Sequence, residues 1–371
     1  MKITQVEAYH LRLPAVEAIC NGTQDALVVR IDTDEGISGW GEVDSSPHVI
    51  KAIYDTPSSH TLSYGLRELL IGEDPFDIRR LWDRMYRGSI YYGRRGAALQ
   101  AISGADIALW DIVGKATGKP VWKLLGGAYH RRVRAYASAL MPENPDDAAA
   151  FARQNLARGF KAMKFGWGPL GKDPGRDEAL VAAVRDAVGP DVDIMIDVGH
   201  AWDAPTAIER IRRLSSYRLY WIEEPLFPDD LDGYARLCDA VDVRIAAGEE
   251  DTGRFAFVEL MDRGRVHVVQ PDVSRCGGLT EALRIADLAY TRGRMVVPHA
   301  FSTGILLAAS LHFAAAIPNG GLLEYVVDGS PLSDGLARVS FSLEDGHISV
   351  PDKPGLGIEV DLDVLGRYRV E

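Results

Sequence analysis

The sequence predicts an α/β protein in which a closed parallel (β/α) barrel follows a smaller α+β domain. Between about Val133 and Val326, eight short apolar strand candidates alternate with amphipathic helical stretches. Polar residues recur at the ends of these strand candidates, which is where such barrels carry their functional groups. An open doubly wound sheet is the competing architecture, but the glycine-rich phosphate turn expected after its first strand is missing.

The eight strand candidates are, in order, VRAYASA, FKAMKFG, DIMID, LYWIEEP, VRIAAGEE, VHVVQPD, MVVPHA and GLLEYV. Stretches such as PDDAAAFARQNLARG and DEALVAAVRDAVG, which lie between them, have helical periodicity. The longest apolar stretch, ILLAASLHFAAAI, is interrupted by Ser310 and His312 and is too short to cross a bilayer. We therefore expect it to form a buried barrel helix.

The chain divides into three parts. Residues 1–125 are expected to form the α+β domain, because ITQVEAYHLRL, ALVVRIDTDEG and SGWGEV suggest an antiparallel meander and two helical segments follow. Residues 126–329 hold the barrel, and residues 330–371 return to strands and turns that should pack back on the first domain. Two aperiodic stretches, 14–25 and 43–60, could overhang the barrel mouth or serve as surface linkers.

Composition excludes several classes of function. The chain has 371 residues, 47% hydrophobic residues and 25% charged residues, as expected of a soluble globular protein. Its net charge of -12 argues against nucleic acid as a partner, and the N-terminus lacks the apolar core of a signal peptide. Three scattered cysteines predict a reduced, cytoplasmic protein, and the shortness of the longest apolar stretch predicts no membrane association. An anionic substrate would need local cations to attract it.

Three carboxylates lie at one repeating interval at the polar ends of apolar runs. Asp197, Glu223 and Glu249 are separated by 26 residues each time. One strand–helix unit takes roughly that many residues, so the spacing predicts equivalent positions on neighbouring strands and convergent oxygens. Any one of them alone would more often be a helix cap or a surface charge. Three ionised carboxylates in one pocket need a divalent cation between them, and an all-oxygen set favours Mg²⁺ over Mn²⁺ or Ca²⁺.

An acid and a histidine on the next two strands form a candidate catalytic dyad. Asp272 ends VHVVQPD, and His299 lies in MVVPHA. A histidine there could instead be a core residue bonded to a backbone carbonyl, but the preceding acid and the opposing metal site favour the dyad. The carboxylate would fix the ring tautomer and stabilise imidazolium, which raises the proton affinity into the range of a useful base.

Further strand-end and loop residues complete the candidate site. Lys164 points inward by strand alternation, and beside a dication it would contact an anionic oxygen of the substrate, although a structural ion pair is the alternative. Glu224 and Glu250 turn away from the ligand side and are interpreted as supporting residues. Trp167 and His200 are candidate substrate contacts in the loops, where aromatic residues more often only pack.

Together these residues resemble the enolase superfamily, and specifically its mandelate racemase subgroup. The resemblance covers nearly the whole chain and rests on the helix DIALWDIVGKATGKPVWKLLGG and on Lys164, Asp197, Glu223, Glu249, Asp272, His299 and Glu324. It implies a modified TIM (β/α) barrel with an N-terminal α+β capping domain that the C-terminal segment completes. It also implies that Mg²⁺ on the three carboxylates binds a substrate carboxylate and stabilises an enediolate. Family members are commonly dimers or octamers, so a homo-oligomer is expected.

One departure from the subgroup's pattern is informative. The subgroup usually has Lys-x-Lys at the end of the second strand, with the second lysine as a base, whereas this chain has Lys164-Phe165-Gly166. The first lysine remains to bind the substrate carboxylate, and the second base is lost. Racemisation needs bases on both faces of the enediolate, while loss of a β-hydroxyl needs only one acid/base.

The resulting hypothesis is a Mg²⁺-dependent dehydratase of an acid sugar, an aldonate or aldarate, that gives a 2-keto-3-deoxy acid. His299, supported by Asp272, would remove the α-proton and then protonate the departing hydroxyl on the same face. Glu324 would hydrogen-bond the substrate carboxylate or assist charge build-up. The alternatives are a racemase or epimerase with an unrecognised second base, and a non-catalytic carboxylate- or metal-binding barrel, which the intact dyad beside the carboxylates disfavours.

Overall fold

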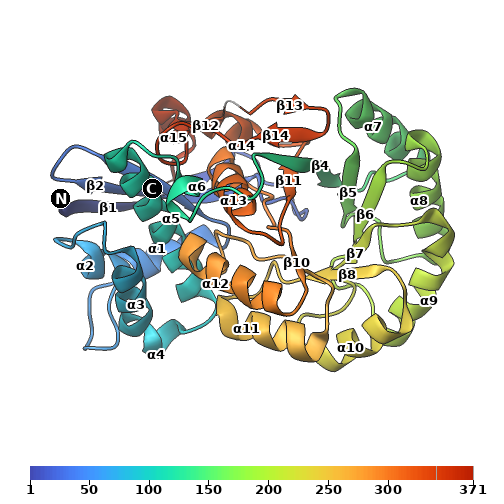
Figure 1. Cartoon of the computed structure of the whole chain (residues 1–371), viewed down its shortest axis with the longest axis horizontal. Helices are drawn as coiled ribbons and strands as arrows, with labels where there is room; N and C mark the ends of the chain where they lie inside the picture. Colours follow the sequence, from blue (N-terminus) through green and yellow to red (C-terminus); the bar gives the residue numbers. More distant parts are fainter. Residues whose placement is uncertain (340, 371) are drawn as a thin grey trace.

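The computed structural model describes residues 1–339 and 341–370 and contains the predicted barrel (Figure 1). Seven parallel strands follow one another in chain order, and the eighth, β11, pairs with β4 on the other side. Among the described residues no ladder joins β10 to β11. The strands are β4 (Arg132–Leu140), β5 (Ala162–Gly166), β6 (Asp193–Asp197), β7 (Trp221–Glu223), β8 (Arg244–Ala247), β9 (Val268–Val269), β10 (Met295–Val296) and β11 (Leu322–Val326).

Helices cover the outside of the barrel, as Figure 1 shows for the ring from α7 to α12. They are α7 (Pro145–Ala157), α8 (Pro174–Val188), α9 (Ala204–Leu214), α10 (Leu231–Ala240), α11 (Gly253–Glu259), α12 (Gly278–Thr291) and α13 (Gly304–Ala316), with short turns η1 (Ser215–Tyr217) and η2 (Leu260–Gly264). The first three begin alike: Asn144, Asp173 and Asp203 accept a hydrogen bond from the N–H three residues on, and a proline follows. The apolar stretch of the sequence forms α13, which is buried almost throughout, as expected.

One layer of apolar side chains closes the barrel interior below the polar ends of the strands. Each strand, or the residue directly after it, contributes one side chain. Large residues lie among small ones, and the rings of Tyr136 and Trp221 meet edge to face with centroids 5.5 Å apart. All of these side chains are buried, so the layer forms an apolar floor beneath the site. The layer consists of Tyr136, Ala162, Met195, Trp221, Ala246, Val268, Val297 and Leu322.

The capping domain is built on an antiparallel meander of β1 (Ile3–Arg12), β2 (Asp25–Thr33) and β3 (Ser38–Val43), as the sequence predicts. The long helix α5 (Ala97–Thr117) packs against it so closely that Gly39 and Gly41 have no space for a Cβ beside the α5 backbone. Shorter helices complete this part. Those that flank the meander are α1 (Pro47–Asp55), α2 (Leu66–Leu70), α3 (Ile78–Gly88) and α4 (Ile90–Gly93), and α6 (Val121–Leu124) leads into the barrel.

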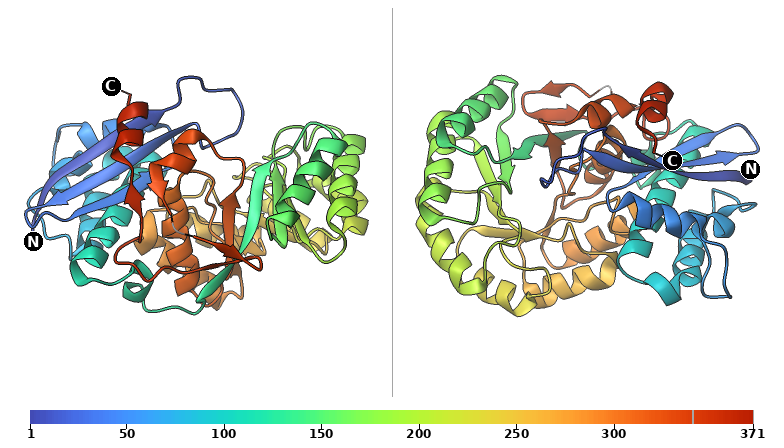
Figure 2. Two further views of the ribbon diagram at one scale, coloured as in Figure 1. Left: turned by 90° about the horizontal axis from the view of Figure 1, so that it is seen from above. Right: turned by 180° about the vertical axis from the view of Figure 1, so that it is seen from behind.

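The C-terminal segment contacts both the capping domain and the barrel. Helix α15 (Leu362–Tyr368) lies beside β1, where Val370 N–H donates to His10 O at 2.8 Å, and the views of Figure 2 show it next to the meander. Strand β14 (His347–Ser349), however, pairs antiparallel with the barrel strand β4. The other elements are α14 (Pro331–Leu336), β12 (Ala337–Arg338), β13 (Leu343–Glu344) and β15 (Glu359–Val360). Among the described residues, none of the helices is both long and apolar enough to traverse a bilayer.

Candidate active site

The predicted site residues form a polar layer directly above the apolar floor of the barrel. Successive side chains of a strand alternate between its two faces, so the residue two positions after a floor residue also points inward. Lys164 thus follows Ala162, Asp197 follows Met195, and Glu223 follows Trp221. Met163 and Phe165 point outward into the core under the helices, as expected. By the same rule the layer includes Ser138, Lys164, Asp197, Glu223, Gln270, His299 and Glu324.

The three equally spaced carboxylates lie together at the top of the barrel. Asp197 and Glu223 are direct neighbours in the parallel ladder of β6 and β7, and Glu249 follows β8 closely. One oxygen from each residue lies within 4.8 Å of the others, and all three side chains are buried. Burial raises the pKa of Asp197 well above its ordinary value, and repulsion from Glu223 adds to the shift. A divalent cation would relieve this cost, so the donor set fits the hard cation that the sequence predicts.

His299 and Asp272 form a hydrogen-bonded pair with Nδ1 and Oδ2 2.6 Å apart, and both are buried. Asp272 also accepts hydrogen bonds at Oδ1 from the backbone and hydroxyl of Ser274, both at 2.6 Å. The other ring nitrogen, Nε2, lies 3.5 Å from Glu249. Burial alone would lower the pKa of His299, but attraction to Glu249 and Glu324 and the hydrogen bond with Asp272 raise it to about 10.

Lys164 contacts two carboxylates in this structure. Its ammonium group pairs with Glu223 and lies 2.9 Å from Glu324. Glu324 also accepts hydrogen bonds from Ser138 Oγ at 2.7 Å and from the Ala300 backbone at 2.8 Å. Burial alone would raise the pKa of Glu324, but Lys164 and His299 lower it to about 2, so the carboxylate is ionised and only accepts hydrogen bonds.

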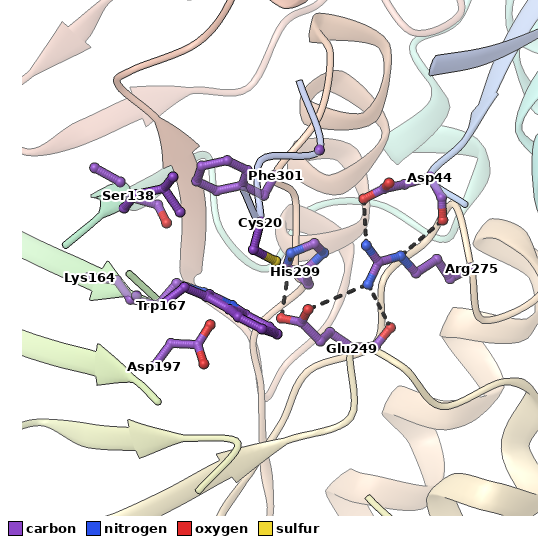
Figure 3. Close-up of a pocket in the computed structure, with 14 residues that line it drawn as sticks. Cys20, Asp44, Ser138, Lys164, Trp167, Asp197, Glu249, Arg275, His299 and Phe301 are labelled. Carbon is purple, nitrogen blue, oxygen red and sulfur yellow. Dashed lines mark hydrogen bonds and ion pairs between the residues drawn. The ribbon is translucent and has the colours of Figure 1, made fainter. Parts of the chain in front are cut away.

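A pocket opens above these residues, and segments of the capping domain form part of its wall. Cys20 and Gly22 reach it from the stretch 14–25, whereas the stretch 43–60 contributes only its second residue, Asp44, to the lining and forms helix α1 further on. Figure 3 shows Cys20 and Phe301 above His299 and Trp167 beside Asp197. The lining residues are Cys20, Gly22, Asp44, Ser138, Ala139, Leu140, Lys164, Gly166, Trp167, Asp197, Glu249, Arg275, His299 and Phe301.

Arg275 and Asp44 are site residues that the sequence reasoning missed. Arg275 Nη2 donates to Asp44 Oδ2 at 2.7 Å, and its guanidinium also lies 3.5 Å from Glu249 Oε1 (Figure 3). The position of Arg275, three residues after Asp272 at a strand end, was an available signal. Asp44 gave none, because it reaches the barrel only through the docking of the capping domain.

Trp167 and His200 lie differently with respect to the pocket. Trp167 lines it, whereas His200 is not among the lining residues and its Nε2 is 2.6 Å from Glu224. The two rings meet edge to face with centroids 5.8 Å apart, so His200 supports Trp167 from behind. Trp167, His200 and Glu224 all have positive φ, of 55°, 60° and 41°. Such backbone strain costs about 1–3 kcal/mol per residue and concentrates at functional sites.

Comparisons with known proteins agree with this architecture. Residues 2–126 match the model of the mandelate racemase/muconate lactonizing enzyme N-terminal domain, and residues 147–364 match that of the enolase C-terminal domain-like family. The chain is 35% identical to D-galactarolactone cycloisomerase of Agrobacterium fabrum, with 100% of this chain and 99% of that protein covered. It is 34% identical to arabinonate dehydratase of Saccharolobus solfataricus, with 96% and 93% covered.

A second dehydratase and one solved structure extend the comparison. D-galactonate dehydratase of Ralstonia nicotianae is 35% identical, with 97% of this chain and 92% of that protein covered. The crystal structure of 3,6-anhydro-D-galactonate cycloisomerase from Zobellia galactanivorans superposes with a TM-score of 0.91 at 34% identity, with 100% of both chains covered. The expected fold, a TIM-type barrel with an α+β cap, is confirmed, and the chain is an enzyme of the lyase type. It belongs to the enolase superfamily, in the mandelate racemase subgroup.

Proposed function

We propose that the protein is a Mg²⁺-dependent acid-sugar dehydratase that uses a single acid/base. The observation that carries this proposal is the composition of the pocket wall. One side presents the His299–Asp272 dyad, and the position that would carry a second lysine base is Gly166, which has no side chain. The relatives named arabinonate dehydratase and D-galactonate dehydratase support an aldonate or aldarate substrate.

Asp197, Glu223 and Glu249 would hold the cation, because their oxygens converge and burial penalises the charges of Asp197 and Glu223 in its absence. When bound, the cation supplies a fixed positive charge for the substrate carboxylate, whose negative charge grows as the α-proton leaves. Glu249, the strongest of the influences that raise the pKa of His299, would be a ligand of that cation. With the charge of Glu249 offset, the pKa of the histidine would lie below about 10, nearer the range in which a base works at neutral pH.

His299 would act at Nε2, since Nδ1 is bonded to Asp272. As a neutral imidazole it takes the proton next to the substrate carboxylate, and Asp272 stabilises the resulting imidazolium. The same nitrogen then protonates the β-hydroxyl as its C–O bond breaks, so that water leaves from the same face. The enol that remains tautomerises to a 2-keto-3-deoxy acid, and no second base is needed.

Lys164 would bind the substrate carboxylate as a cation. Burial alone would lower its pKa, but Glu223 and Glu324 raise the pKa well above its ordinary value, and Glu324, which is not a proposed cation ligand, would keep its effect when the cation is bound. The structure suggests a different role for Glu324 from direct contact with the substrate carboxylate. Its oxygens already accept from Ser138, Ala300 and Lys164, and an ionised carboxylate cannot donate to another. We propose that it orients Lys164 and the backbone after His299.

A ring-opening cycloisomerase is the second candidate, because a 35% identical relative and a closely similar structure are named as cycloisomerases of sugar-acid derivatives. The chemistry differs little: if the β-oxygen belongs to a ring, removal of the α-proton breaks the ring C–O bond and no water is lost. Racemase or epimerase activity with a second base is the less favoured alternative, since Gly166 offers no proton acceptor and Lys164 is protonated.

A substrate screen in D₂O tests these possibilities together. The enzyme with Mg²⁺ is incubated with a panel of aldonic and aldaric acids, their lactones and their anhydro derivatives, and products are followed by mass spectrometry and a 2-keto acid assay. Loss of the elements of one water with a new keto group supports dehydration, and a keto product that keeps those elements supports ring opening; either product gains deuterium from the solvent when its enol tautomerises. Deuterium at the α-carbon with inversion and no keto acid would refute both.

We also propose that the protein forms a homo-oligomer, a dimer or an octamer, as the family resemblance implies. Size-exclusion chromatography with light scattering measures the mass directly. A mass of one chain across the micromolar range would contradict this proposal.

A further inference from the structure

The end of strand β3 reaches from the capping domain into the loops that carry the proposed dyad. Side chains of β3 alternate between two faces: Val43 packs in the core of the capping domain, whereas Trp40 packs in the core shared with the barrel. Glu42 and Asp44 follow Trp40 at successive intervals of two residues, so all three share the barrel-facing side. The core of the capping domain therefore gives no reason for a carboxylate at either position.

Glu42 is completely buried and accepts four hydrogen bonds from one barrel segment. Its Oε1 accepts from Ser302 Oγ at 2.7 Å and the Thr303 backbone at 3.2 Å. Its Oε2 accepts from Thr303 Oγ at 2.7 Å and the Leu306 backbone at 2.9 Å. This segment begins three residues after His299 and opens helix α13.

Asp44 holds the neighbouring loop in the same manner. Its backbone N–H donates to Ser274 Oγ at 3.1 Å, and its backbone oxygen accepts from Arg275 Nε at 3.0 Å. Its carboxylate accepts from Arg275 Nη2 at 2.7 Å. The hydroxyl of Ser274 in turn donates to Asp272 Oδ1 at 2.6 Å. One strand end therefore bonds to both loops from which the dyad projects.

Simple helix capping does not account for Glu42. Helix α13 already has a cap of its own, because Thr303 Oγ accepts from the Ile305 N–H at 3.1 Å. Burying a carboxylate away from solvent is costly, and burial raises the pKa of Glu42 to about 7. A carboxyl group buried at such a cost, with four hydrogen bonds to the segment after His299, indicates a demand for fixed geometry.

We propose that Glu42 and Asp44 are positioning residues for the His299–Asp272 dyad, so that docking of the capping domain aligns the acid/base. This inference rests on the proposed function in one respect, namely that His299 is the acid/base. Neither residue touches the reacting atoms in the proposed mechanism. Their effect passes through Ser302 and Thr303 in one loop and through Ser274 and Arg275 in the other.

The hydrogen bonds of Glu42 and Asp44 to the two loops that carry the dyad are called the clamp. Glu42→Gln is the variant that weakens this clamp with the least change in shape. Each carboxylate oxygen of Glu42 faces one backbone N–H, from Thr303 or Leu306. In glutamine one of these oxygens becomes an NH₂ group, which cannot accept, so either orientation of the amide leaves one buried N–H without a partner. A protonated Glu42 would keep both acceptors, so the variant does not merely mimic the neutral acid.

Asp106→Asn is the matched control. Asp106 is also a completely buried carboxylate of the capping domain, and burial likewise raises its pKa to about 7. It accepts from the backbone of a barrel helix, from Thr280 N–H at 2.9 Å, and its Oδ1 has no partner, so asparagine keeps the bond that exists. It makes no contact with the segment after His299.

The experiment compares wild type, Glu42→Gln, Asp44→Asn and Asp106→Asn by steady-state kinetics, Mg²⁺ titration and amide hydrogen exchange with mass spectrometry. For Glu42→Gln we expect kcat to fall about 10- to 100-fold, as small misplacements of catalytic groups do, while KM and the Mg²⁺ Kd stay within about threefold. Exchange should rise in residues 299–306 for Glu42→Gln and in residues 272–277 for Asp44→Asn. Asp106→Asn should leave kcat and both segments near wild type.

The outcomes separate this proposal from the proposed function. Unchanged kcat with unchanged exchange in both clamp variants would overturn it, as would a uniform rise in exchange over the whole molecule, which indicates general destabilisation. If Glu42→Gln does not fold, Asp44→Asn decides. If wild type converts no acid sugar, the proposed function fails, and exchange in the two loops still decides whether the clamp exists.

Discussion

Gly166→Ala tests whether the proposed metal site requires a residue without a side chain at this position of β5. Gly166 is the ladder neighbour of Asp197, and a Cβ added there would lie 3.1 Å from Asp197 Cβ and 3.2 Å from its Oδ2. Such contacts are tight, so Asp197 must shift by a few tenths of an ångström. A side chain about 30° away from its rotamer costs about 0.5–1.5 kcal/mol, and if that cost falls on the cation-bound state, Mg²⁺ binds about 2- to 13-fold more weakly.

Isothermal titration of the metal-free proteins with Mg²⁺ measures this change. Gly366→Ala is the matched control, because that glycine lies in α15 with no atom within 4 Å of an added Cβ, so its Kd should equal that of wild type. An unchanged Kd in Gly166→Ala would refute the reasoning, since either Asp197 would not hold the cation or its orientation would not matter. Thermal unfolding of both variants checks that the barrel is intact.

The remaining predictions concern the base, the cation and a histidine outside the site. His299→Asn should lower kcat about 10²- to 10⁴-fold with the Mg²⁺ Kd retained, and undiminished turnover would exclude it as the base. Chelation with EDTA should abolish turnover and lower the Tm, and added Mg²⁺ should restore both. His312, whose Nδ1 accepts from Trp122 N–H, has a pKa lowered by burial from 6.5 to about 4. The folded state therefore resists protonation, and stability present above pH 6.5 should be lost as pH falls towards 4. A pKa difference of about 2.5 corresponds to about 3 kcal/mol. Urea unfolding should show a smaller loss between these pH values in His312→Gln, and equal losses would contradict the assignment.

The barrel and its polar layer follow from the sequence because both depend on short-range periodicity. One strand and one helix repeat at a nearly constant length, so Asp197, Glu223 and Glu249 occupy equivalent places on successive strands. The two-residue alternation of each strand then places Lys164 above Ala162 and Glu223 above Trp221, with no information from elsewhere in the chain.

The contacts of the capping domain could not be predicted in the same way. Ser274 and Asp44 are 230 residues apart, and their hydrogen bond exists only because the capping domain and the barrel dock in one orientation. No local sequence pattern shows that Glu42 faces the barrel, because this depends on which face of β3 packs in the core of the capping domain. His200 pairs with Glu224 and does not line the pocket. This arrangement depends on the left-handed backbone at both residues, which their residue types do not predict.

The position of Gly166 joins the metal site to the proposed reaction. Every residue except glycine begins with a Cβ, and in the β5–β6 register of this chain that atom meets Asp197. In this chain a second base at this position would therefore require Asp197 to shift by a few tenths of an ångström from the place it has beside Gly166. Restoring the lysine by Gly166→Lys should for that reason weaken Mg²⁺ binding and not create a racemase. Inversion of a 2-hydroxy acid by that variant, measured by chiral chromatography with Mg²⁺ affinity intact, would show that the two requirements are independent.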